Sequence, residues 1–292
     1  MAMGLEFGFD KQEQPHKCSV EYVCYDGAFY KTDTPFVTLS EIPAQYGTIS
    51  ETLWCRSDTP FRYDYHYRNI QHRLSALGIE DFNLPSSTDL LNRIKALAAR
   101  NRYVGKYSVI EISLWMSATK HLHYIIKRTP HDTSPIEIPQ KPFILSPLYD
   151  FQINSVATSS SGLQKESDFL TQKKPNNIDD YLLFNAAKRA IRTIGGNIFI
   201  FKNYDLTYVS TKAGSAFSAT TPLILEAAQE MHLNIIQTDG IEYNQLLNAR
   251  ECIVDHLTLG PQVVIGIDEH RFSETKDAKS MVAYIRRRFM KE

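Results

Sequence analysis

The chain has 292 residues, of which 43% are hydrophobic and 22% are charged, so its length allows two domains that each bury a core. The formal net charge of −1 and the pI of about 6.8 exclude the strongly basic character that nucleic acid or an anionic membrane would attract. No apolar run approaches the length that crosses a bilayer, and the four cysteines form no CxxC pair, so we expect a cytoplasmic protein with reduced thiols.

The first half of the chain reads as paired strands and two amphipathic helices. Strand-forming residues flank the turn dipeptide Asp26-Gly27, which predicts a hairpin. Apolar residues recur at helical spacing through residues 70–77, and a second helix follows Ser86, a residue suited to capping. Strands are expected at about 106–116 and 121–128.

A segment with linker composition, NSVATSSSG at 154–162, predicts the domain boundary. The expected division is therefore a first domain at 1–150, an interdomain loop at 151–162 and a second domain at 163–292.

The second half mixes strands with helices. A helix is expected at about 221–232, with Pro222 at its first position, and a final amphipathic helix carries Met281 and Ile285 inward. Strands are predicted at 180–185, 197–202, 234–238, 252–256 and 262–268. This pattern predicts an enzyme-like α+β or α/β architecture.

Three segments, in order, resemble the class IV aminotransferases, which bind pyridoxal 5′-phosphate (PLP). They are YDGAFYKTDTPFVTLSEIPAQYGTISETLW with the helix after it, DDYLLFNAAKRAIRTIGGNIFIFKN, and the pair SATTPLILEAAQEMHLNIIQ and CIVDHLTLGPQVVIGIDEHRF. The resemblance implies the two-domain α+β (α/β) fold of the D-amino-acid aminotransferases, PLP fold type IV. It also implies a homodimer that acts on an amino-acid-like or amino-chorismate-like substrate, as an aminotransferase or an aminodeoxychorismate lyase.

The resemblance implies that a lysine after the interdomain loop holds PLP as a Schiff base. Lys165, in KESDFL, matches this context, and Lys173 and Lys174 are competing candidates nearby. Such an amine must be partly neutral to act as a nucleophile, and it then moves the proton at the substrate Cα.

The family places a glutamate against the pyridine nitrogen of PLP, where this chain has Arg192. Because a guanidinium stays protonated, Arg192 would donate to an unprotonated ring nitrogen and weaken the electron sink. The alternative is that Arg192 lies in solvent at a strand end.

The residues expected to bind the cofactor's phosphate also differ from the family. Its arginine falls at Asn69, with Arg68 and Arg73 as neighbours that could substitute for it. Its threonine falls at Leu257, next to Thr258. The turn before the predicted helix at 221 still offers backbone N–H groups at Ala219 and Thr220. These departures support a second hypothesis, a cofactor-free relative that kept the fold and binds a ligand or partner.

Two histidines, His121 and His123, alternate on a predicted strand and so share a face. They and Lys120 are candidates for binding an anion such as the substrate carboxylate, or they belong to an exposed hairpin. Because no third ligand of matching spacing is evident, we expect no metal site.

Overall fold

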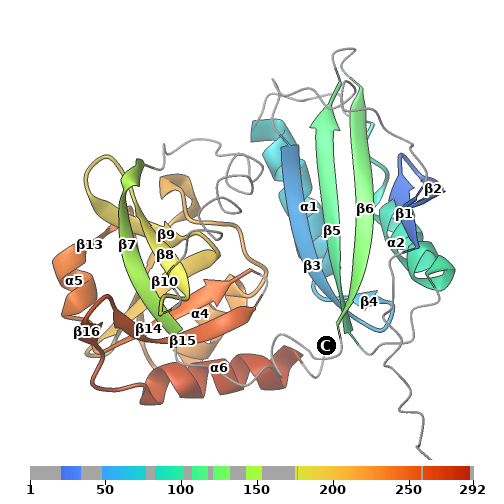
Figure 1. The fold of residues 1–292 in the computed structure, drawn as a ribbon. Coiled ribbons are helices and arrows are strands. Elements are labelled where there is room, and N and C mark those ends of the chain that lie inside the picture. The colour runs from blue at the N-terminus through green and yellow to red at the C-terminus, as the bar shows by residue number, and fades with distance from the viewer. Residues whose placement is uncertain are drawn as a thin grey trace, which may run out of the picture.

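The protein is described by a computed structural model, which covers residues 21–33, 48–76, 83–101, 107–117, 121–131, 143–152, 175, 177–257 and 259–289. Two β-sheets, each with its own helices, stand side by side in Figure 1.

The first sheet has the strand order β2-β1-β6-β5-β3-β4. Every pairing within it is antiparallel, and β5 pairs along its length with both β3 and β6. The strands are β1 (Tyr22–Tyr25), β2 (Ala28–Lys31), β3 (Thr48–Arg56), β4 (Thr59–Pro60), β5 (Tyr107–Met116) and β6 (Leu122–His131).

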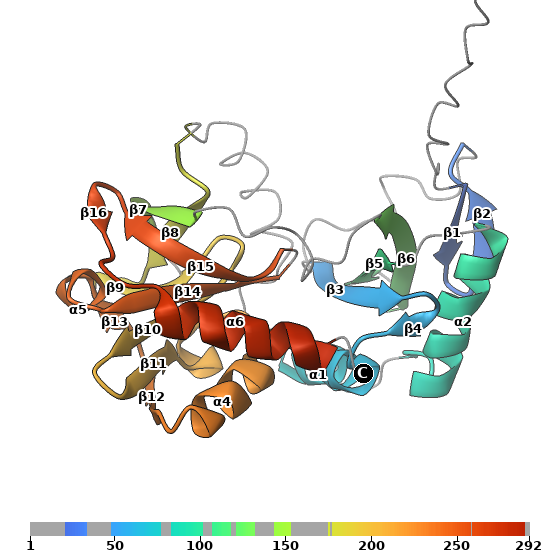
Figure 2. The same ribbon diagram turned by 90° about the horizontal axis from the view of Figure 1, so that it is seen from below.

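Two helices, α1 (Tyr63–Ala76) and α2 (Ser87–Arg100), cover one face of this sheet, as Figure 2 shows. Ser86 caps α2 by accepting a hydrogen bond from the backbone N–H of Asp89 at 3.1 Å, which fixes where the helix begins. Apolar side chains at helical spacing, including Leu90, Ile94 and Leu97, pack into a core with the strands. The first domain therefore has a two-layer α+β arrangement.

The second sheet has the order β12-β11-β10-β14-β15-β7-β8-β9-β13, with β16 paired to β15. Most of its pairings are antiparallel, but β7 runs parallel to both β8 and β15, and β11 runs parallel to β12. The strands are β7 (Phe143–Gln152), β8 (Asp180–Phe184), β9 (Arg189–Thr193), β10 (Gly196–Lys202), β11 (Asp205–Val209), β12 (Asn234–Thr238), β13 (Ile241–Glu242), β14 (Glu251–His256), β15 (Gly260–Ile267) and β16 (His270–Arg271).

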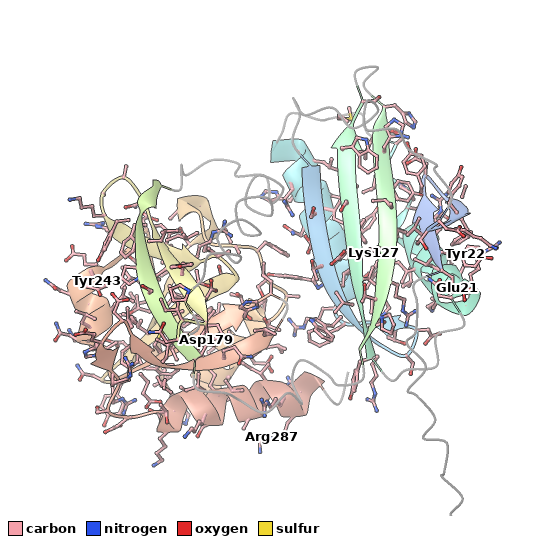
Figure 3. All side chains as sticks on the ribbon, in the orientation of Figure 1. Glu21, Tyr22, Lys127, Asp179, Tyr243 and Arg287 are labelled. Carbon is pink, nitrogen blue, oxygen red and sulfur yellow. The ribbon has the colours of Figure 1, made fainter. Side chains whose placement is uncertain are left out.

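Strand β7 belongs to this second sheet, although the sequence analysis grouped residues 143–150 with the first domain. Asp179, labelled beside β7 in Figure 3, holds its start, because its carboxylate accepts the N–H of Ile144 at 2.7 Å. The predicted interdomain loop lies, from residue 153 on, outside the described residues.

The helices of the second domain are α4 (Thr221–Glu230), α5 (Tyr243–Leu247), α6 (Lys276–Phe289) and a 3-10 turn, η2 (Thr211–Ala213). Residues of α4 and α6 form one core with β10, β11, β14 and β15. A second core, which includes Leu182 and Ile191, fills the other face of the sheet. The sheet is therefore buried on both faces.

The two domains touch through the start of α1. Tyr65 stacks on Phe217 with ring centroids 4.6 Å apart, and Arg62 Nη1 donates to the carbonyl oxygen of Ala219 at 3.5 Å. Phe61 packs against the core that contains α4 and α6. These contacts bring α1 against the loop that leads into α4.

Most predicted elements are confirmed, including the hairpin at Asp26-Gly27, the Ser86 cap and the helix with Pro222 in its first turn. Strands β3, β7, β9 and β11 were not predicted as separate elements. Within the described residues, the structure contains no helix that is long and apolar enough to cross a membrane.

A buried carboxylate caps the final helix and provides a test of the fold. Glu251 is fully buried on β14, and its oxygens accept the N–H groups of Ala278 at 2.8 Å and Asp277 at 3.2 Å. We expect Glu251→Ala to lower the free energy of unfolding by about 2 kcal/mol, because the first turn of α6 loses charge-assisted partners. Urea denaturation measures this loss. The exposed Glu269→Ala is the control, and an equal effect in both variants would contradict the capping role.

Candidate functional site

Arg192 brings a positive charge into the protein interior near the domain interface. It lies on β9 opposite Leu183 of β8 and is only 6% exposed. Within the described part of the chain, its Nε and Nη2 atoms meet no hydrogen-bond acceptor. This burial contradicts the alternative that Arg192 lies in solvent at a strand end.

Burial lowers the pKa of Arg192 to about 10, and two charged neighbours adjust it further. Asp180, in the same domain, favours the charged form, whereas Arg73 of α1 disfavours it. Arg192 therefore lies within electrostatic range of both domains and remains a cation at neutral pH. A buried cation with unsatisfied donors suits an anion or a neutral acceptor atom.

The turn at 218–221 leads into α4 and carries the two backbone N–H groups expected to receive a phosphate. Asn197 holds the loop before it, because its side-chain amide both donates to and accepts from the backbone of Ala216, each at 2.6 Å. The N–H of Thr220 already donates to Ser218 Oγ at 3.2 Å. The N–H of Ala219 donates to no acceptor among the described residues.

A carboxylate lies at the same helix end. Asp255 of β14 is fully buried and accepts hydrogen bonds from Oγ1 of Thr220 and, at 3.0 Å, from Oγ1 of Thr221. Burial raises the pKa of Asp255, although hydroxyl donors from Thr220, Ser218 and Thr221 oppose that rise. A group that can be negative thus occupies the positive end of the α4 dipole, where a phosphate would otherwise be favoured.

Asn69 belongs to a buried network around Glu51 of β3. Its Nδ2 donates to Glu51 Oε2 at 2.7 Å, while His66 Nδ1 lies 2.6 Å from Glu51 Oε1. Arg73 joins through Nη1, 3.4 Å from Glu51 Oε2 and 2.8 Å from the carbonyl oxygen of Ser50. Three side chains of α1 therefore anchor this helix to β3, and the amide of Asn69 is engaged there.

Leu257 offers an anion no side-chain donor, and its backbone N–H already bonds the carbonyl oxygen of Gly195 at 2.8 Å. Gly195 lies tightly against His256, since a Cβ at that position would come within 2.1 Å of His256 Nε2. A side chain at residue 195 would therefore displace His256. The neighbouring candidate, Thr258, lies outside the described residues.

Lys165, Lys173 and Lys174 also lie outside the described residues, so the choice among them stays a prediction. The segment that carries them connects β7 to β8, and β8 pairs with β9, the strand of Arg192.

The structure brings Ala219 and Thr220 together with Asp255 and Arg62, and it brings Asn69 together with Glu51; the sequence alone did not single out Asp255, Arg62 or Glu51. A sequence signal existed for Asp255, because it is an acidic residue inside an otherwise apolar strand segment, CIVDHL, and such residues are seldom buried without a specific partner. Arg62 gave no comparable signal, because its contact with Ala219 depends on how the two domains meet.

No protein family model matches the chain, and no curated protein matches it. Solved structures do. A branched-chain amino acid aminotransferase from Thermobaculum terrenum, also solved in its PLP form, superposes with a TM-score of 0.79 at 14% identity, covering 94% of both chains. A branched-chain aminotransferase from Thermoproteus uzoniensis, solved with norvaline, gives 0.78 at 15% identity, covering 92% of this chain and 95% of that one.

A fold IV transaminase from Curtobacterium pusillum gives a TM-score of 0.73 at 12% identity, covering 91% of this chain and 93% of that one. These likenesses extend over nearly the whole chain and include both sheets. The chain has the two-domain α+β fold of the class IV aminotransferases.

Proposed function

We propose that this chain is a PLP-dependent enzyme of aminotransferase or aminodeoxychorismate lyase type that acts, as a homodimer, on an amino-acid-like substrate. The main support for this proposal is Arg192, a buried guanidinium whose Nε and Nη2 atoms have no acceptor among the described residues. A protein retains such an unsatisfied cation at a folding cost, which a ligand that supplies the missing acceptor would offset.

The donors of Arg192 fit the pyridine nitrogen of PLP, because a guanidinium donates and an unprotonated ring nitrogen accepts. The turn at 218–221 fits a phosphate through the backbone N–H of Ala219 and the N-terminus of α4. Arg62, whose guanidinium reaches the carbonyl oxygen of Ala219, adds a positive charge on this side. When bound, the cofactor supplies an electron sink for the carbanion at the substrate Cα.

The chain's own residues would bind the cofactor, move the proton and exclude water. Lys165 would hold the cofactor covalently and move the proton at the substrate Cα. Arg192, protonated at neutral pH, would keep the ring nitrogen unprotonated by donating to it. The electron sink would then be weaker than that of a ring whose nitrogen is protonated and donates to a carboxylate. The stacked pair Tyr65 and Phe217 would keep the two domains together over the site and limit the access of water.

A second candidate function is a cofactor-free relative that binds another ligand between the domains. The specific observation in its favour is Asp255, which supplies a carboxyl group where the phosphate would bind. Asn69 is tied to Glu51, and Leu257 adds no polar side chain. Under this hypothesis Arg192 would pair with an anionic ligand of different shape.

Addition of PLP to the purified protein distinguishes the two functions. We expect a visible absorption band from an imine, and borohydride should then attach the cofactor permanently to Lys165. We also expect the unfolding free energy to rise by about 2.7 kcal/mol when PLP is in hundredfold excess over its dissociation constant. Lys165→Ala should lose the band, whereas Lys173→Ala and Lys174→Ala should keep it. A colourless protein with an unchanged melting temperature would support the cofactor-free relative instead.

Replacement of the buried cation tests whether Arg192 is kept for a ligand. Arg192→Met removes unsatisfied buried donors, so we expect the ligand-free protein to gain about 1 kcal/mol of stability in urea while its stabilisation by PLP disappears. Arg189→Met, on the same strand but exposed, should change the stability by less than about 0.5 kcal/mol and leave the PLP response intact. A strongly destabilised Arg192→Met would indicate a structural role.

The carboxyl group of Asp255 predicts a pH dependence. Because its pKa is raised in the folded state, its contribution to stability is present at low pH and is lost as pH rises through that pKa. The ionised form should also repel phosphate, so we expect Asp255→Asn to remove this loss and to bind inorganic phosphate or PLP about tenfold more tightly at a pH above the raised pKa of the wild-type carboxyl. Calorimetric titration measures the affinity, with the exposed Asp239→Asn as control. Equal affinities in wild type and Asp255→Asn would remove Asp255 from the anion site.

A further inference from the structure

Three side chains with metal-binding atoms meet in the first domain, on residues outside the interdomain site. They are Asp26, in the turn between β1 and β2, and His121 and His123, at the start of β6. One ligand atom from each lies within 4.8 Å of the other two. Asp26 and His123 are 97 positions apart in the chain, so spacing along the sequence does not reveal the third ligand.

Hydrogen bonds hold two of these side chains in place. Asp26 Oδ1 accepts the N–H of Tyr124 at 2.8 Å, and its Oδ2 lies 2.6 Å from His123 Nδ1. The hydroxyl of Tyr25 lies 3.0 Å from the same Nδ1. The carboxylate is therefore fixed where β1 ends and β6 begins, with one oxygen directed at an imidazole.

Aromatic rings fix the orientation of the same imidazole. Trp115 and Tyr25 both stack with the His123 ring, with centroids 5.8 and 5.9 Å away. His121 meets His123 edge-on at 4.8 Å, and its Nε2 lies 3.1 Å from Asn83 Nδ2. Because His121 is exposed, its ring can turn toward the other two ligands at little cost.

We propose that Asp26, His121 and His123 form a binding site for a divalent transition metal ion. Two imidazoles and one carboxylate are the donor set that Zn²⁺, Ni²⁺ and Cu²⁺ accept, and three protein ligands leave at least one coordination position open to water. Ligand atoms about 2 Å from zinc lie roughly 3.3 Å from one another. The cluster therefore closes when the exposed His121 imidazole turns inward and the ion displaces the proton shared by Asp26 and His123, whose 2.6 Å separation then widens. The hydrogen bonds to Asp26 and the rings around His123 supply the outer support that metal ligands need.

The alternative is that Asp26 and His123 only stabilise the hairpin by pairing with each other. That role requires nothing from His121. The exposed His121 therefore separates the two interpretations, since its removal should leave the fold intact and weaken metal binding alone.

The test uses the full-length chain without an affinity tag, stripped with a chelator and titrated with ZnCl₂ in a calorimeter. We expect one ion per chain, with at least about tenfold weaker binding in His121→Ala and in Asp26→Asn. His72→Ala removes an exposed histidine on α1 and should bind as wild type does. Absence of binding, or undiminished binding in His121→Ala, would overturn the site.

Fluorescence gives an independent readout, because Trp115 stacks on a proposed ligand and the chain has only two tryptophans. In a Trp54→Phe background, CuCl₂ should quench the emission of Trp115 at one equivalent. The quenching should disappear when His121→Ala is added. Quenching that persists there would assign the ion to other groups and contradict the proposal.

Discussion

The burial of Arg192 places an incompletely hydrogen-bonded positive charge near the domain interface. A guanidinium that is 6% exposed and has two nitrogens without an acceptor among the described residues opposes folding, and its lowered pKa reflects that cost. Asp180 compensates in part, whereas Arg73 adds repulsion from the other domain. The rest of the fold must therefore offset the free-energy cost of burying this charge. The two hydrophobic cores that cover both faces of the second sheet provide that stability.

Asn69 and Asp255, which lie where the proposed cofactor's phosphate would bind, both have hydrogen-bond partners within the protein. The amide of Asn69 completes the network around Glu51 that anchors α1 to β3. Asp255 likewise satisfies the hydroxyls of Thr220 and Thr221. These side chains are therefore engaged within the protein, and an anion would have to be held by backbone donors and by Arg62 while the Asp255 carboxyl is near.

Local signals in the sequence predicted much of the fold. Ser86 and Pro222 mark helix starts that the structure confirms, because capping and the missing N–H of proline act over a few residues. Strand β7 could not be predicted from local signals, because it lies in a proline-rich segment and pairs with strands far along the chain. At the site, the sequence pointed to Arg192, but only the folded chain shows its burial and its nearness to Arg73.

A crystal structure of the protein grown with PLP tests the central claim most directly. The account predicts electron density continuous from a lysine Nζ to the cofactor, with the guanidinium of Arg192 within hydrogen-bonding distance of the pyridine nitrogen. Density that leaves the donors of Arg192 unpaired, or that shows them bound to a different molecule while PLP is excluded, would contradict it. The architecture would stand in either case, because it depends on the two packed sheets and not on the cofactor.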